Sequence, residues 1–230
     1  MISTKNHLEK LKINQLLDLS EFVVTENFKH HSNNILPENY KTDVNSIYKE
    51  EVNYFNDSEV FVSKDASGSI SGSIRVLRWN YKDMLPIQKI FGINPLLVTG
   101  DENVSINDVW HIGRFAIKKE VKDINLFKQL MVCAISPICK HKGNIAFAEC
   151  DSKLLRILNL LGIKATVIGN SINYLGSETI PILMTYDGLI DFYTQNIGLV
   201  PTNVLNQSTK NNTLQERVVF TKQTLNYPLV

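Results

Sequence analysis

The chain has 230 residues, of which 43% are hydrophobic and 20% are charged. This composition is typical of a globular protein with a substantial core and does not favour disorder. The 24 Lys and Arg residues nearly balance the 23 Asp and Glu residues, so the net charge of +1 gives no overall attraction to nucleic acid. No apolar run approaches the roughly 18 residues of a membrane span, and the first residues lack the apolar core of a signal peptide. We therefore expect a cytoplasmic protein with no membrane span and no nucleic-acid partner.

The cysteines and histidines do not predict a disulfide framework or a metal site. There are three cysteines, which is an odd number, and no two of them form a CxxC pair. His30 and His31 are adjacent, so on a helix their side chains point about 100° apart and do not easily share a metal ion. We expect Cys150 to be a small apolar filler rather than a nucleophile.

The first half of the chain predicts two helices followed by a β-hairpin. Residues 8–13 fit either an opening strand or a first helical turn, and residues 16–29 and 43–54 show helical periodicity. The stripe of the second helix is predicted at Val44, Ile47, Tyr48 and Val52. Residues 59–63 and 70–77, separated by a turn at 65–68, predict the hairpin. A long connection at 79–104 follows, with a short helix expected at 85–91.

The second half alternates strands and helices. We expect strands at residues 109–117 and 144–149, and helices at 124–141 and 152–161. Pro137 is expected to shorten the first of these helices, and Gly162 to end the second. Strands at 165–168 and 180–185 flank a turn-rich segment, residues 188–195 are ambiguous, and residues 206–213 read as a polar loop. The order predicts one α/β domain at residues 1–195 and a partly mobile C-terminal extension at 196–230.

This order of elements resembles the acetyltransferase-like (GNAT) fold over residues 8–190. The resemblance implies a mixed central sheet with helices on both faces. A second resemblance lies in the strand sequence His-Ile-Gly-Arg-Phe-Ala-Ile that starts at His111. It is similar to the pattern Glu-x-Ser/Thr-Arg-Phe/Leu-x-Val of the autoinducer (acyl-homoserine-lactone) synthases and N-acyl amino acid synthases. Arg114 and Phe115 match that pattern, whereas His111 stands in place of its Glu and Gly113 in place of its hydroxyl residue. Residues 174–181 also look like that branch.

The segment before the expected central helix bears on the acyl donor. Acetyl-CoA-dependent members of the fold carry a glycine-rich motif there, whose backbone N–H groups bind the pyrophosphate. Residues 118–125 contain no glycine. The autoinducer-synthase branch often lacks these glycines and takes its acyl group from acyl carrier protein. The resemblance thus implies acyl–phosphopantetheine or acyl-CoA as a donor substrate, no permanently bound cofactor, and acyl carrier protein as a partner.

The function implied is N-acyl transfer of a long chain to a small-molecule amine, such as an amino acid. Two alternatives stay open. The chain is a short-chain, acetyl-CoA-dependent N-acetyltransferase, or it is a non-catalytic relative that binds acyl chains or a partner protein.

Three residues are candidates for catalysis. His111 is the leading general base, since an imidazole titrates near neutrality, with a structural histidine as the alternative. Glu149 follows a buried strand and is the second candidate. Arg114 lies in an apolar strand and is expected to form an organising ion pair or to clamp a carboxylate. Its expected partner is Glu59, Asp43 or Glu149.

Further residues are candidates for substrate binding. The resemblance implies a splayed central strand, with backbone N–H groups of Phe115, Ala116 and Ile117 facing the thioester carbonyl and Gly113 as a bulge site. Lys118 and Lys119, together with Lys122, are expected to meet donor phosphates or the carrier protein. Tyr174 is a candidate proton donor to the leaving thiolate. Apolar residues of the long connection are expected to line an acyl tunnel: Trp79, Leu85, Phe91, Leu96 and Leu97.

Overall fold

The computed structural model of the chain describes residues 7–31, 35–98, 106–174 and 177–206. The strands are β1 (His7–Lys10), β2 (Ser58–Lys64), β3 (Ile70–Arg78), β4 (Val109–Ile117), β5 (Ile145–Cys150), β6 (Ala165–Val167), β7 (Ile172–Tyr174) and β8 (Ser177–Thr185). The helices are α1 (Leu16–His31), α2 (Tyr40–Tyr54), α3 (Pro86–Phe91), α4 (Pro95–Val98), α5 (Ile124–Ile135), α6 (Ser152–Leu160), α7 (Tyr186–Asn196) and α8 (Thr202–Asn206).

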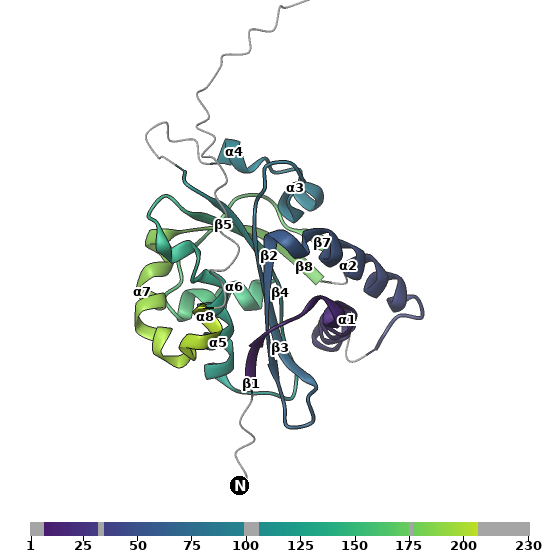
Figure 1. Ribbon diagram of the computed structural model, residues 1–230. Helices are drawn as coiled ribbons and strands as arrows, with labels where there is room; N and C mark the ends of the chain where they lie inside the picture. The colour runs from purple at the N-terminus through teal and green to yellow at the C-terminus, as the bar shows by residue number, and fades with distance from the viewer. Residues whose placement is uncertain (1–6, 32–34, 99–105, 175–176, 207–230) are drawn as a thin grey trace, which may run out of the picture.

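These strands form a mixed sheet in the order β1-β2-β3-β4-β5-β8-β6, with β7 paired to β8 beside this path. All neighbouring pairs are antiparallel except β4 and β5, which are parallel. Helices α1 and α2 lie on one side of the sheet, and α5, α7 and α8 on the other (Figure 1). The expected α/β architecture, with β4 central and helices on both faces, is confirmed.

Most expected elements are present, and the differences have local causes. The helix expected at 124–141 ends at Ile135, because Pro137 has no N–H to continue the helical hydrogen bonds. A 3-10 turn, Ile138–Lys140, follows it. The ambiguous segment 188–195 belongs to α7, whose start is capped by the Thr185 hydroxyl accepting from the Gly188 N–H at 3.3 Å. The sequence did not indicate α4, β7 or α8.

The buried stripe of α2 differs from the expected one. Tyr48 and Val52 are exposed, and the buried positions are Val44, Ile47, Glu51 and Tyr54. This spacing is equally helical, but it brings a carboxylate into the interior. The interior must therefore supply a partner for Glu51.

The ends of α6 follow from local chemistry. Asp151 is its N-cap, and the carboxylate accepts the Leu154 N–H at 2.6 Å. Gly162 has a φ of +82°, the left-handed conformation that ends a helix without a Cβ clash. Asp151 is the one residue between the end of β5 and the start of α6, so the two ends lie close together.

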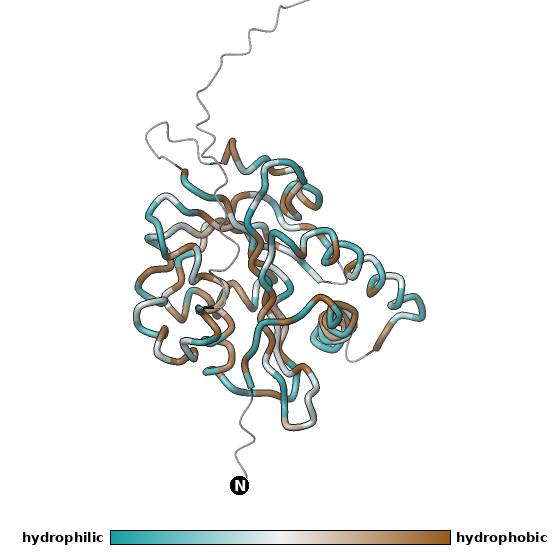
Figure 2. Tube along the Cα trace, viewed as in Figure 1, coloured by the Kyte–Doolittle hydropathy of each residue, from teal (hydrophilic) through white to brown (hydrophobic). Residues whose placement is uncertain are grey.

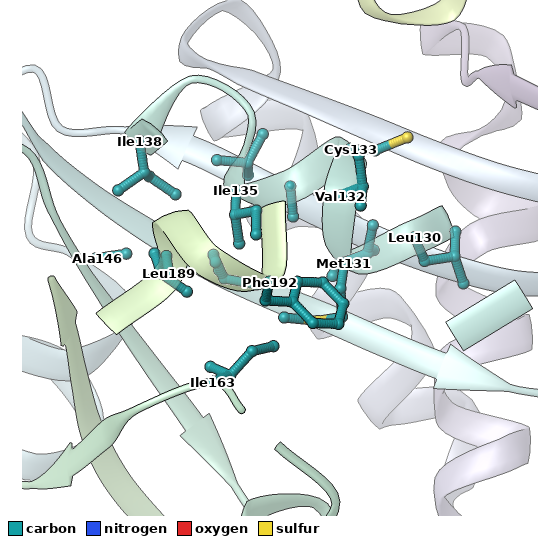
Figure 3. Close-up of a cluster of buried hydrophobic side chains, with 14 of the residues drawn as sticks. Leu130, Met131, Val132, Cys133, Ile135, Ile138, Ala146, Ile163, Leu189 and Phe192 are labelled. Carbon is teal, nitrogen blue, oxygen red and sulfur yellow. The ribbon is translucent and has the colours of Figure 1, made fainter. Parts of the chain in front are cut away.

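The main core lies between the sheet and helices α5 to α8. Figure 2 shows hydrophobic residues concentrated along the central strands, whereas α2 alternates polar and apolar residues. In Figure 3, Leu189 and Phe192 of α7 lie beside Met131 and Ile135 of α5. The close approach of α7 to the chain before β6 requires Gly188, since a Cβ there would lie 2.6 Å from the Lys164 carbonyl oxygen.

The C-terminal part of the described chain packs on the same core. Val200 and Val204 lie beyond the expected boundary at residue 195, yet both are buried. Residues 207–230, which include most of the expected polar loop, lie outside the described residues. Within the described part, no helix combines the length and the hydropathy that a bilayer crossing needs.

Candidate functional site

A gap opens in the middle of the sheet where β4 and β5 separate. Their parallel pairing joins Val109–Ile112 to residues 145–148 and ends there, although β4 continues to Ile117 and β5 to Cys150. The Lys118 N–H donates to the Ser71 carbonyl at 2.9 Å, on the β3 side. Because successive N–H groups of a strand point to opposite edges, the Ile117 N–H points toward the gap. The splayed strand implied by the resemblance is thus present.

A bulge in β4 borders this gap. Opposite Ile74 of β3 lie two residues of β4, Arg114 and Phe115, so the irregularity falls one residue after the expected Gly113. Arg114 has a φ of +54°, a conformation that costs a non-glycine residue on the order of 1 kcal/mol. Its carbonyl accepts the Ser73 hydroxyl at 2.8 Å. The bulge is therefore fixed by contacts of Arg114, not by glycine flexibility.

A cavity of about 210 Å³ lies at the gap and reaches both faces of the sheet. On the face of α5 and α6 its lining is apolar and includes Met131, Leu154, Leu158, Ile182 and Met184. On the face of α1 and α2 it is polar and includes Asn27, His31, Glu50, Arg114 and Tyr174. His111 and Glu149 line it between the two sides.

A buried ion-pair network supports the polar side. Glu51 of α2, with a fully buried side chain, accepts from Arg75 at 2.5 Å and from the Arg114 Nε at 2.7 Å through the same Oε1 atom. The Arg114 Nη2 also donates to Glu50 at 2.8 Å. Arg114 therefore forms the expected organising ion pair, but its partners are Glu50 and Glu51. The expected partner Glu59 instead pairs with Lys10 at 2.9 Å.

His111 lies between Arg75 and Glu149 and is only 1% exposed. The Arg75 Nη2 is 3.2 Å from the His111 Nδ1, and the Nε2 is 2.9 Å and 3.0 Å from the two Glu149 oxygens. A guanidinium only donates, so Nδ1 accepts and the Nε2–H donates to Glu149. Both ring nitrogens are thus engaged within the protein. The Glu149 side chain is 12% exposed and faces the cavity.

Burial sets the pKa of two further groups that line the cavity. Burial raises the pKa of the Cys150 thiol to about 12, with Asp151 and Glu149 acting in the same direction. The thiol therefore stays protonated near neutral pH, which supports its reading as an apolar filler. Burial also raises the pKa of Tyr174; Arg114 opposes this, while Glu50 and Glu149 add to it. The Tyr174 hydroxyl accordingly stays protonated and is able to donate a hydrogen bond.

The carboxyl group of Glu51 has a pKa below its ordinary value of 4.5. Burial acts to raise this pKa, but the guanidinium groups of Arg75 and Arg114 outweigh it. A carboxyl group whose pKa is lowered by folding stabilises the protein fully above its unfolded-state pKa. This stabilisation is lost as the pH falls through the lower, folded-state pKa.

We therefore expect the free energy of unfolding to decrease as the pH falls below about 4.5, the ordinary pKa of Glu51. Urea titrations between pH 7 and pH 3 measure this on the parent protein and on Glu51→Gln. The difference between the two proteins should be largest near neutral pH and shrink in acid. A difference that stays constant with pH would contradict the ion-pair assignment.

The segment between β4 and α5 does not present an open anion site. The Lys119 N–H donates to the Glu26 carboxylate at 2.9 Å, and the Lys119 Nζ donates to the Lys29 carbonyl at 2.6 Å. Lys118 lies 3.7 Å from Asp65. At the start of α5 the Asp123 carboxylate caps the Asn125 N–H at 2.8 Å. Lys118 and Lys119, two of the expected phosphate-binding lysines, thus have partners within the protein.

The long connection contributes differently from the expectation. Trp79 and Leu85 are buried in a separate cluster beside β5, and the Trp79 Nε1 donates to the Asp83 carbonyl at 2.8 Å. Leu96 and Leu97 are exposed. Among the described residues of this connection, Pro86 and Ile90 of α3 line the cavity. Trp79 is thus not among the residues that line the cavity.

Three site residues were missed from the sequence: Glu50, Glu51 and Arg75. A signal for two of them was available. Glu51 follows Val44 and Ile47 at helical spacing, and Arg75 lies between the apolar residues Ile74 and Val76 of β3. A charged residue at an inward position requires a partner of opposite charge, so the two form a natural pair.

Three solved structures illustrate what the fold is similar to. FeeM, an N-acyl amino acid synthase from uncultured soil microbes, has a TM-score of 0.57 and 12% identity; the match covers 85% of this chain and 99% of FeeM. BjaI, a CoA-dependent acyl-homoserine lactone synthase, has a TM-score of 0.54 and 15% identity, over 85% of this chain and 92% of BjaI. A GNAT-family acetyltransferase from Staphylococcus aureus Mu50 has a TM-score of 0.50 and 13% identity; the match covers 79% of this chain and 99% of the acetyltransferase.

At these identities the likeness shows the fold: the chain has the acetyltransferase-like (GNAT) fold, as the order of elements predicted. Its structural neighbours include the autoinducer and N-acyl amino acid synthases to which the strand at His111 bears a resemblance. No protein-family model matches the sequence, and a comparison with curated proteins found no match.

Proposed function

We propose that the protein is an N-acyltransferase that moves a long acyl chain from a thioester to the primary amino group of a small molecule. The donor is acyl carrier protein or CoA, and amino acids are among the expected acceptors. The observation that carries this proposal is the cavity at the β4–β5 gap, with an apolar lining on one face of the sheet and a charged lining on the other. The acyl chain and the amine then approach the same point from opposite faces.

The reaction needs a base, oxyanion donors and a place for the leaving thiolate. The amine nitrogen attacks the thioester carbon, a C–N bond forms and the C–S bond breaks. The proton leaves the nitrogen for a base, and the departing thiolate takes up a proton, so the products are an amide and a thiol. The Ile117 N–H, which points toward the gap, is the donor that we propose for the oxyanion.

Glu149 is the better candidate for the base. Its carboxylate faces the cavity, whereas His111 is buried behind it and already donates its Nε2–H to it. With Nδ1 accepting from Arg75, the neutral imidazole has no free nitrogen for the amine proton. We therefore assign proton acceptance to Glu149, and to His111 the positioning of that carboxylate.

The segment before α5 supports acyl carrier protein over CoA as the donor. In this protein the carboxylates of Glu26 and Asp123 bind the backbone N–H groups of Lys119 and Asn125. A pyrophosphate placed there would meet negative charge where it needs donors. Phosphopantetheine on a carrier protein carries no pyrophosphate, so this donor does not need a pyrophosphate site at the start of α5.

A donor series tests the proposal. The full-length protein is incubated with a pool of amines and with acyl donors from two to sixteen carbons, each as the CoA and as the acyl carrier protein thioester. Thiol release is followed, and mass spectrometry identifies the amide. We expect the highest rate with long-chain acyl carrier protein, a lower rate with long-chain CoA and the lowest with acetyl-CoA.

Two results would overturn parts of this assignment. Highest activity with acetyl-CoA would favour the short-chain acetyltransferase. No thiol release with any donor and any amine would favour a non-catalytic protein that binds acyl chains or a partner.

A further inference from the structure

The charges around the cavity bear on which amine it accepts. Every basic side chain among the described residues that line the cavity has a carboxylate partner inside the protein. These pairs are Arg75 with Glu51, Arg114 with Glu50 and Glu51, His111 with Glu149, and His31 with Asp151 at 3.2 Å. Each of these basic side chains is thus already paired inside the protein.

Arg114 is the cation that a carboxylate clamp would use, and its geometry argues against that use. Its Nε donates to Glu51 and its Nη2 to Glu50, at 2.7 Å and 2.8 Å. A ligand carboxylate bound to this guanidinium would lie beside both glutamates. Like charges placed together across a binding interface oppose binding strongly, so an α-carboxylate is disfavoured here.

Negative charge is in excess at the cavity. Three carboxylates line it, those of Glu50, Glu149 and Asp151, and a fourth, Glu51, lies behind the lining and is shared by two guanidinium groups, those of Arg75 and Arg114. The second oxygen of Glu51 is buried and has no hydrogen-bond partner. Glu50 and Glu149 keep exposed fractions of 23% and 12% while lining the cavity, so a ligand can reach both.

From this arrangement we infer that the acceptor is an alkyl diamine: a primary amine with a second positive charge and no carboxylate. The inference rests on the proposed N-acyltransferase function and narrows its acceptor. One amino group loses its proton to Glu149 and forms the amide. The other stays protonated and pairs with Glu50 on the α2 side of the cavity. Tyr174 lines the same cavity.

A matched set of acceptors tests this inference. 1,4-Diaminobutane and ornithine share one carbon skeleton and differ by the α-carboxylate, and butylamine lacks the second amino group. We expect kcat/KM for 1,4-diaminobutane to exceed that for ornithine by at least about 10-fold, because like-charge contacts are costly. It should also fall more steeply with added NaCl than kcat/KM for butylamine, since salt screens the second charge. The donor is the best one of the series above.

A variant of Glu50 provides a second readout. Glu50→Gln removes one carboxylate and leaves the Arg114 Nη2 with a neutral neighbour, so the 1,4-diaminobutane to ornithine ratio of kcat/KM should fall about 10-fold. Glu38→Gln, at an exposed position just before α2, makes the same charge change away from the cavity and should leave the ratio unchanged. The salt dependence of kcat/KM is measured on the parent protein, so it tests the inference even if Glu50→Gln does not fold.

The outcomes separate the two proposals. Ornithine or another amino acid acylated faster than 1,4-diaminobutane would overturn the diamine inference and leave the acyltransferase in place. An equal salt dependence of kcat/KM for 1,4-diaminobutane and butylamine would likewise overturn the diamine inference and leave the acyltransferase in place. If no amine is acylated with any donor, the proposed function itself fails.

Discussion

Glu149→Gln is expected to lower the turnover number about 10²–10⁴-fold, the usual contribution of a general base. The amide keeps the size of the side chain but does not accept the amine proton. Residual activity should rise with pH, because the amine then loses its proton to solvent. The measurement is a pH–rate profile at saturating long-chain donor, with the parent protein as reference.

His111→Ala is the informative companion variant. If His111 only positions Glu149, its loss should reduce turnover less than the loss of Glu149 and should leave a base-dependent limb in the pH profile. If His111→Ala is as inactive as Glu149→Gln and its pH–rate profile has no base-dependent limb, His111 is the general base. Parent-like turnover of Glu149→Gln across the pH range would contradict the mechanism.

Glu51→Gln is expected to destabilise the fold by about 3–5 kcal/mol, the usual cost of breaking a buried ion pair on one side. The Arg75 side chain is 1% exposed, and its guanidinium loses its carboxylate partner when Glu51 becomes an amide. Arg114 keeps Glu50, so the cost falls mainly on Arg75. Urea unfolding at pH 7 measures the difference.

A double variant separates the ion pair from simple packing. Glu51→Leu combined with Arg75→Met removes both charges, and its stability should exceed that expected from adding the two single variants. Exposed Glu38→Gln serves as the control for a lost negative charge and should change stability by less than about 0.5 kcal/mol. An unchanged unfolding free energy for Glu51→Gln would show that the network carries no net stability.

Local patterns predicted most of the secondary structure because the signals lie within a few residues of the elements they define. Pro137 shortened α5 as its missing N–H requires, and Gly162 ended α6 in the left-handed conformation. In the turn-rich segment before β8, local patterns did not predict β7, because this strand is defined by its pairing with β8. The three residues of β7 lie within a segment rich in turn residues, so no local pattern marked them as a strand.

The candidate site was only partly predictable. His111, Arg114 and Glu149 were identified from their places on two strands, and the structure brings all three to one cavity. The partners of Arg114 were not among the expected ones, because α2 supplies them from 63 and 64 positions away. Local sequence patterns do not predict contacts between residues that lie so far apart in the sequence.

The sequence by itself determined the elements, their order and hence the α/β fold, because periodicity, caps and breakers act over a few residues. It also indicated that a charged residue, Arg114, lies within the apolar strand β4. Only the tertiary structure decided how the buried charges combine. The packing of α2 against the sheet pairs Glu51 with Arg75 and Arg114, and the separation of β4 from β5 opens the cavity beside them. Ion pairing and strand separation depend on contacts between distant segments, so they are fixed only when the whole chain is folded.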